Sequence, residues 1–175
     1  MAKATTTLLT GMLLVTALQV SAQDTTEAVT THRDRWSVFI EDNPTECWVA
    51  SAPKETVNTR GGAQVEVRRG DILMFVAYRP TQGVSGEISF TGGYPFAENS
   101  TVSLVIDDRS FDLISDGEWA WSEGPEADSQ ILAAMKAGVD AVVTGRSQRG
   151  TTTRDTFSLI GFTAATDEAA RRCSS

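Results

Sequence analysis

The chain has 175 residues, with 15 lysine and arginine residues against 23 aspartate and glutamate residues, and a formal net charge of −8 at pH 7. Nucleic acid and anionic membrane surfaces repel a chain this acidic unless its basic groups are concentrated in one place. The charge therefore argues against a nucleic-acid partner. The length is that of one domain, which can bury roughly two thirds of its unfolded surface without a metal or many crosslinks.

Residues 1–22 are predicted to be a signal peptide. Lys3 precedes a predominantly apolar run at 8–20, and a small-x-small pattern ends at Ala22, where cleavage is expected. Polar residues interrupt the run, which is shorter than the roughly 20 apolar residues of a membrane span. Export would place the mature chain in the periplasm, with attachment to the outer membrane or secretion as alternatives, and with no transmembrane span. Residues 23–34 are predicted to be a flexible leader, and residues 35–175 a single domain.

From residue 36 onward, short runs of alternating or apolar residues between turn residues predict β-strands. The predicted strands are 36–40, 47–51, 63–67, 72–78, 87–90, 101–106, 110–114, 139–144 and 153–161. Residues 54–62 are predicted to be a loop, and the run 72–78 is apolar enough to be buried on both faces. Helices are predicted at 126–137, between Pro125 and Gly138, and at 163–172. This pattern predicts an all-β, jelly-roll-like β-sandwich with one or two short helices.

The two cysteines, Cys47 and Cys173, lie near the two ends of the predicted domain. In an exported protein an even pair most simply forms a disulfide, and the second helix is expected to bring Cys173 to Cys47. A reactive thiol is the alternative, but no neighbouring histidine or motif favours it.

A series of motifs runs through the predicted domain in a fixed order. They are ECWVAS at 46–51, GGYPF at 92–96, EWAW at 118–121, AMKAG at 134–138, GRSQRGT at 145–151 and DTFSLIGF at 155–162, between Trp36 and Cys173. With these motifs, over nearly all of the mature chain, the sequence resembles the invasion-associated locus B family of exported alphaproteobacterial proteins. The resemblance implies an all-β sandwich in the periplasm or cell envelope and a role linked in pathogens to host-cell invasion. It implies no known enzymatic activity and no agreed ligand.

Few residues suit catalysis or metal binding. The single histidine, His32, lies in the predicted leader, which argues against a serine–histidine–aspartate triad and against a zinc site. No metal or other cofactor is therefore predicted. Carboxylates such as Asp112 and Glu118 occur in or beside predicted turns, where turn chemistry explains most acidic residues. A carbohydrate-active enzyme or other hydrolase that uses Asp112 or Glu118 stays open as an alternative.

The stretch 145–154, made of the loop that joins the predicted strands 139–144 and 153–161 and the start of the second strand, is the most suggestive candidate site. It carries Arg146, Arg149 and Arg154 beside small hydroxyl residues such as Thr151. Arginines in such a setting can hold a phosphate, a carboxylate or an acidic sugar. The spacing is not that of a phosphate-binding P-loop.

Trp119 and Trp121 form a second candidate site. Because they alternate with Ala120, they face the same side of any strand. Exposed tryptophans can stack on a sugar or bind a partner, but we expect at least one of them to fill the core.

Together these observations predict an envelope protein that binds an envelope protein or a glycan and performs no chemistry. A secreted adhesion factor that acts on a host cell is a further alternative.

Overall fold

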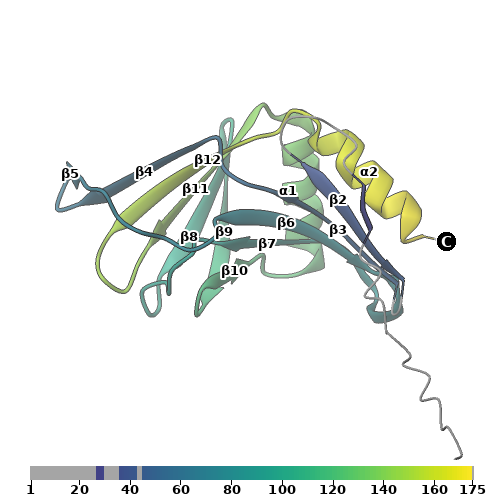
Figure 1. Cartoon of the computed structure of the whole chain (residues 1–175), viewed down its shortest axis with the longest axis horizontal. Helices are drawn as coiled ribbons and strands as arrows, with labels where there is room; N and C mark the ends of the chain where they lie inside the picture. The colour runs from purple at the N-terminus through teal and green to yellow at the C-terminus, as the bar shows by residue number, and fades with distance from the viewer. Residues whose placement is uncertain (1–26, 30–35, 43–44, 175) are drawn as a thin grey trace, which may run out of the picture.

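The computed structural model describes residues 27–29, 36–42 and 45–174 (Figure 1). The predicted signal peptide and most of the predicted leader lie outside the described residues. Within the leader, strand β1 (Glu27–Val29) pairs antiparallel with β2 (Ser37–Asp42). The leader prediction therefore differs from the structure at these three residues.

The remaining elements follow in chain order. They are β3 (Thr45–Ser51), β4 (Glu55–Arg60), β5 (Ala63–Gln64), β6 (Leu73–Arg79), the 3₁₀ turn η1 (Pro80–Gln82), β7 (Val84–Thr91), β8 (Thr101–Ile106), β9 (Arg109–Asp116), β10 (Trp119–Trp121), α1 (Pro125–Ala137), β11 (Asp140–Arg146), β12 (Thr152–Ser158) and α2 (Phe162–Arg172). The described strands form one antiparallel sheet in the order β1-β2-β3-β6-β7-β10-β9-β8-β11-β12-β4-β5. None of the described helices is long and apolar enough to cross a membrane.

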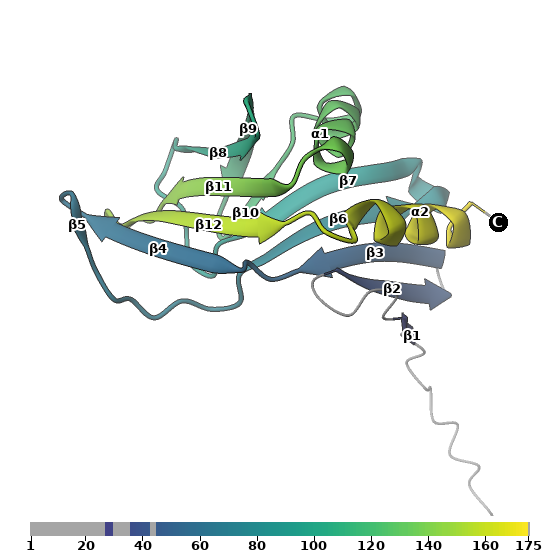
Figure 2. The same ribbon diagram turned by 90° about the horizontal axis from the view of Figure 1, so that it is seen from above.

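This sheet bends until its two halves face one another. Phe90 on β7 packs edge to face against Phe157 on β12, with ring centroids 6.0 Å apart, although four strands separate β7 from β12 in the sheet. A hydrogen bond also joins the two halves: the indole N–H of Trp36, just before β2, donates to the carbonyl of Ser158, at the end of β12, at 2.8 Å. Figures 1 and 2 show β4, β11 and β12 toward one end of the molecule and β2, β3 and α2 toward the other. The fold is thus all-β and sandwich-like, as predicted.

Alternating strand residues and one face of each helix fill a single core. Buried members include Val38, Val49, Val76, Ile88, Phe90, Leu104, Leu113, Val143 and Phe157 from the strands, with Ile131 and Met135 from α1 and Phe162, Ala165 and Ala169 from α2. Because successive strand residues point to opposite faces of a sheet, strands such as β2, β8 and β11 contribute every second side chain to this core.

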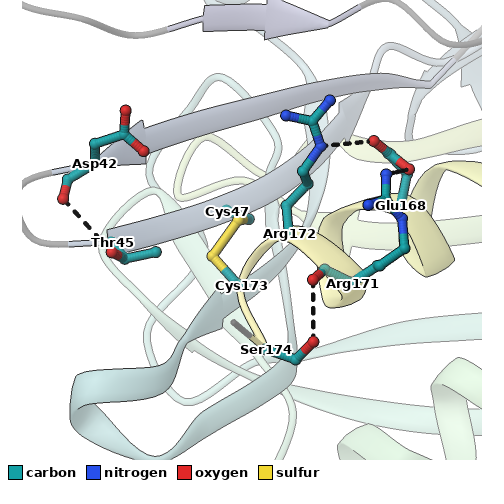
Figure 3. The surroundings of a disulfide bond; sticks show 8 residues. All are labelled: Asp42, Thr45, Cys47, Glu168, Arg171, Arg172, Cys173 and Ser174. Carbon is teal, nitrogen blue, oxygen red and sulfur yellow. Dashed lines mark hydrogen bonds and ion pairs between the residues drawn. A yellow bond between two sulfur atoms is a disulfide. The ribbon is translucent and has the colours of Figure 1, made fainter.

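Both predicted helices are present. A proline opens α1, acidic residues occupy its first turn, and Lys136 lies in its last turn, an arrangement that suits the helix dipole. The second helix packs on β2 and β3 and brings Cys173 to Cys47 on β3 (Figure 3). The two residues form a disulfide with Cα atoms 5.9 Å apart, which confirms the predicted pairing.

Several predicted boundaries are wrong. Residues 54–62 are not a loop, because β4 forms a full ladder with β12. β4 lies near the edge of the sheet and is mostly exposed or half-buried, so it lacks the apolar alternation that marks a strand. The predicted strand at 63–67 is only β5, and the predicted strand at 87–90 begins earlier, as β7. Within β6 only one face is in the core, and Phe75 is half-buried on the outside.

Candidate functional site

The hairpin β11–β12 ends in a short, well-bonded loop. The backbone N–H of Ser147 donates to the carbonyl of Thr151, and that of Gly150 donates to the carbonyl of Ser147, both at 2.9 Å. Gly150 has φ +78°, a conformation that favours glycine. The loop therefore spans only residues 147–151, whereas the sequence predicted a loop from 145 to 152, because the ladder continues to the pair Arg146–Thr152.

A cleft of about 520 Å³ lies beside this loop. Five segments that are far apart in the sequence line it: the end of β4, the connection from β5 to β6, the segment after β7, the turn between β9 and β10, and the β11–β12 loop with its flanks. The lining residues are Arg60, Val67, Arg68, Arg69, Gly93, Tyr94, Pro95, Glu118, Ser147, Gln148, Arg149, Thr151 and Thr153.

The cleft is basic in an acidic protein. The guanidinium of Arg60 donates to the hydroxyl oxygen of Thr151, at 2.7 Å from Nη2 and 3.3 Å from Nε. The side chains of Arg68 and Arg149 are exposed and form no hydrogen bond or ion pair with any described residue. Glu118 is the one carboxylate in the lining. Among the described residues, three arginines without a carboxylate partner thus face one glutamate.

A buried ion pair forms one wall of the cleft. Arg69 donates to both carboxylate oxygens of Asp155, at 2.7 and 2.6 Å, and to the carbonyl of Gly92 at 2.8 Å. The side chains of Arg69 and Asp155 are 6% and 0% exposed. Burial raises the pKa of Asp155 above its ordinary value, and the hydrogen bonds from Arg69 oppose this shift. A bidentate pair of this kind fixes the position of both side chains.

Tyr94 completes this wall. Its ring packs against the guanidinium of Arg69, with the guanidinium carbon 5.0 Å from the ring centroid. Its hydroxyl shares a hydrogen bond of 2.6 Å with Thr153. Gly145 leaves room for this arrangement, because an added Cβ there would lie 2.9 Å from the Tyr94 hydroxyl. The wall is therefore held by contacts from three separate segments.

Only part of the predicted arginine site comes together. Arg149 and Thr151 line the cleft, but Thr151 is 3% exposed and already accepts from Arg60. Arg154 lies on a different surface, beside Asp107 and Asp140, and Arg146 is exposed without lining the cleft. The pleat explains this separation, because Thr153 and Asp155 point inward and the residue between them must point outward.

The predicted tryptophan pair lies elsewhere, on the outer face of the sheet. Ala120 is fully buried and faces Phe90 on β7, so its neighbours Trp119 and Trp121 both point outward. The prediction that one of them fills the core is wrong, because the small alanine takes the inward position opposite a large phenylalanine. Trp119 remains 39% exposed.

Sequence reasoning missed four residues of the cleft: Arg60, Arg68, Arg69 and Tyr94. The adjacent pair Arg68-Arg69 was a visible signal, but it was assigned to a turn. No sequence pattern indicated that the end of β4 would lie against the β11–β12 loop.

The carboxylates considered for catalysis are also apart. Glu118 lines the cleft, whereas Asp112 is exposed on β9 and does not. Within the described ranges, no group of three or more histidine, cysteine, aspartate or glutamate residues could hold a metal ion.

Comparison with known proteins shows the family. The model of the family described as Invasion associated locus B (IalB) protein matches residues 36–170. Among solved structures, that of invasion associated protein B from Bartonella henselae matches with a TM-score of 0.55 and 13% identity, covering 84% of this chain and 99% of that chain. At this identity the structural likeness shows the shared fold alone. No curated protein matches. Since the family model spans most of the chain, the protein belongs to the invasion associated locus B family.

Proposed function

We propose that this protein is a non-enzymatic binding module of the cell envelope, and that its arginine cleft holds an anionic group. The observation that carries the proposal is the convergence of Arg60, Arg68 and Arg149 without a carboxylate partner among the described residues. These arginines come from distant segments of an acidic chain. Such a concentration of positive charge favours a phosphate, a carboxylate or an acidic sugar.

Part of the cleft is already organised for binding. Thr151 orients the guanidinium of Arg60, and Asp155 holds Arg69 in the wall, so of the four arginines only the exposed Arg68 and Arg149 must be ordered when a ligand enters. Arginine is suited to this role because its planar guanidinium matches a carboxylate or phosphate with two parallel hydrogen bonds.

The same geometry supports binding over turnover. Glycoside hydrolysis in most families needs two carboxyl groups that flank the scissile bond. Glu118 alone lines the cleft, and the nearby Asp155 is buried against Arg69. A hydrolytic activity that is lost in Glu118→Gln would replace this proposal with the enzymatic alternative.

Calorimetry with two anionic probes, inorganic phosphate and trigalacturonic acid, tests the proposal, with maltotriose as the neutral comparison. The double variant Arg68→Gln/Arg149→Gln should weaken anion binding by at least about tenfold, or 1.4 kcal/mol. The control Arg146→Gln/Arg154→Gln removes the same charge outside the cleft and should leave the affinity nearly unchanged. Equal losses in both variants, or no binding of either anion, would contradict an anion site in this cleft.

The envelope location rests on the leader sequence and the family. It predicts that the chain isolated from the periplasm begins at Gln23, after cleavage at Ala22. Amino-terminal sequencing of the protein from fractionated cells tests this. Recovery from the cytoplasm with an intact leader would contradict it, and recovery from the medium or cell surface would favour the adhesion alternative.

A further inference from the structure

The outer face of the half-sheet β2-β3-β6-β7-β10 carries a row of aromatic side chains. Phe39 and Trp48 stack across neighbouring strands, with ring centroids 5.4 Å apart and planes 10° apart. Trp119 and Trp121 stack along β10 at 6.1 Å, and Phe75 lies 5.6 Å from Trp119. All five side chains are half-buried or exposed, so this row lies outside the core.

A groove of about 380 Å³ runs through this row. Trp48 on β3 forms one wall, and Trp119 and Trp121 on β10 form the other. The floor between them includes two small residues: Ala77, which pairs with Trp48, and Ser89, which pairs with Trp121. Since β3 and β10 are three strand steps apart, the walls are roughly 14 Å apart. Large side chains on both sides of small ones thus create a recess on this face of the sheet.

The groove carries excess negative charge. Glu41, Glu46 and Glu87 line it together with one cation, Arg79. The guanidinium of Arg79 is shared between Glu46, at 3.2 Å, and Glu87. Glu41 makes no ion pair with any described residue. Three carboxylates against one guanidinium leave two uncompensated negative charges beside the tryptophans.

Both features favour the same kind of ligand. The face of a tryptophan ring attracts cations, and arginine stacks on it most often. The carboxylates Glu41, Glu46 and Glu87 would in turn accept hydrogen bonds from a guanidinium or an ammonium group. A neutral glycan could stack on the rings and donate hydroxyl groups to the carboxylates, but it carries no positive charge to compensate the negative charge excess.

We propose that this groove docks a basic segment of a partner protein. An arginine or lysine side chain of this segment lies against the ring face of Trp48 or of the Trp119–Trp121 pair, and its charged head contacts the glutamates. The surface is separate from the arginine cleft and opposite to it in charge, so the two proposals stand or fall independently.

The test uses the mature, disulfide-intact chain and three probes: the peptide acetyl-Gly-Arg-Gly-Arg-Gly-amide, its glutamate counterpart and cellopentaose. Binding is followed by tryptophan fluorescence and calorimetry. The arginine peptide should bind, and the other two probes should not bind measurably at the same concentration. Preference for cellopentaose or for the glutamate peptide, or no binding of the arginine peptide, would overturn the proposal.

Variants then locate the site and separate it from general attraction to an acidic protein. Glu46→Gln/Glu87→Gln removes the charge excess and frees Arg79, so the affinity should fall at least tenfold, whereas Glu55→Gln/Glu66→Gln on exposed positions should change it little. Arg79→Gln should strengthen binding severalfold, whereas Arg154→Gln, with the same change in net charge, should not. Equal effects within either matched pair would show that the groove is not the binding site.

Discussion

Replacing Arg69 with methionine tests whether the buried ion pair organises the cleft wall. The substitution removes both hydrogen bonds to Asp155, the hydrogen bond to the Gly92 carbonyl and a longer one to Asn58. Asp155, which is fully buried, is then left as an uncompensated charge. Breaking a buried pair in this way costs about 3–5 kcal/mol, a large share of the roughly 5–15 kcal/mol that stabilises a typical domain.

Urea denaturation followed by tryptophan fluorescence measures this cost. With a urea dependence near 2 kcal/mol per molar, a loss of about 4 kcal/mol lowers the midpoint by about 2 M. Arg68→Met is the matched control. Arg68 is the preceding residue, its side chain is exposed, and it forms no hydrogen bond or ion pair with any described residue. A loss below about 1 kcal/mol for Arg69→Met, or equal losses for both variants, would refute the reasoning.

A second substitution, at Asp155, and the pH dependence of stability sharpen this test. The double variant Arg69→Met/Asp155→Leu removes both charges and should be far more stable than Arg69→Met alone. In Arg69→Met the pKa of Asp155 should rise further above its unfolded value, because the opposing hydrogen bonds are lost. The folded state then binds the proton more tightly than the unfolded state, so this variant should regain stability as pH falls and lose it as pH rises through the folded pKa.

Three further predictions concern the rest of the fold. The disulfide closes a separation of 126 residues, so its reduction should lower the free energy of unfolding by about 5 kcal/mol in the chain-entropy model. An unchanged melting temperature under reductant would contradict this. Gly93→Ala places a Cβ 2.6 Å from the backbone oxygen of Gly70, at a residue with φ +70°. The free energy of unfolding should therefore fall by more than the roughly 1–3 kcal/mol that backbone strain alone costs. Gly83→Ala, at φ +71° with nothing within 4 Å, is the control, and an equal loss of stability in both variants would contradict the clash. Burial, with a smaller effect from Asp167, raises the pKa of Tyr78 to about 12. The contribution of the neutral phenol to stability is therefore complete below pH 10.0 and is lost as pH rises through about 12. A phenolate absorbance step for Tyr78 near pH 10.0 would contradict this.

Local sequence patterns were sufficient for the regular elements. The strand at 101–106 was predicted with the bounds of β8, and both helices were predicted within one residue of their observed ends. These segments carry their own signals: apolar alternation between turn residues in β8, a proline start with acidic and basic ends in α1, and an alanine-rich composition in α2. The pairing of Cys47 with Cys173 followed because two cysteines in one chain leave a single intramolecular choice.

The candidate site was predicted only in part. Arg149 was identified from its loop, but Arg60 and Arg68 were not associated with it, because nothing local indicates that β4 pairs with β12. Arg154 was included for its position in the sequence, although the pleat turns it to the opposite face. The predicted tryptophans belong to a separate, acidic groove, to which β3 and β6 contribute Trp48 and Phe75.

The sequence by itself determined the class of fold, the helices and the disulfide. These features depend on residues close in the chain or on pairing choices that are already limited. Only the tertiary structure decided which charges share a surface, because the bent sheet places strands side by side that are distant in sequence. That arrangement placed the two predicted sites in a basic cleft and in an acidic aromatic groove, and the sign of the charge in each determines the ligand that it favours.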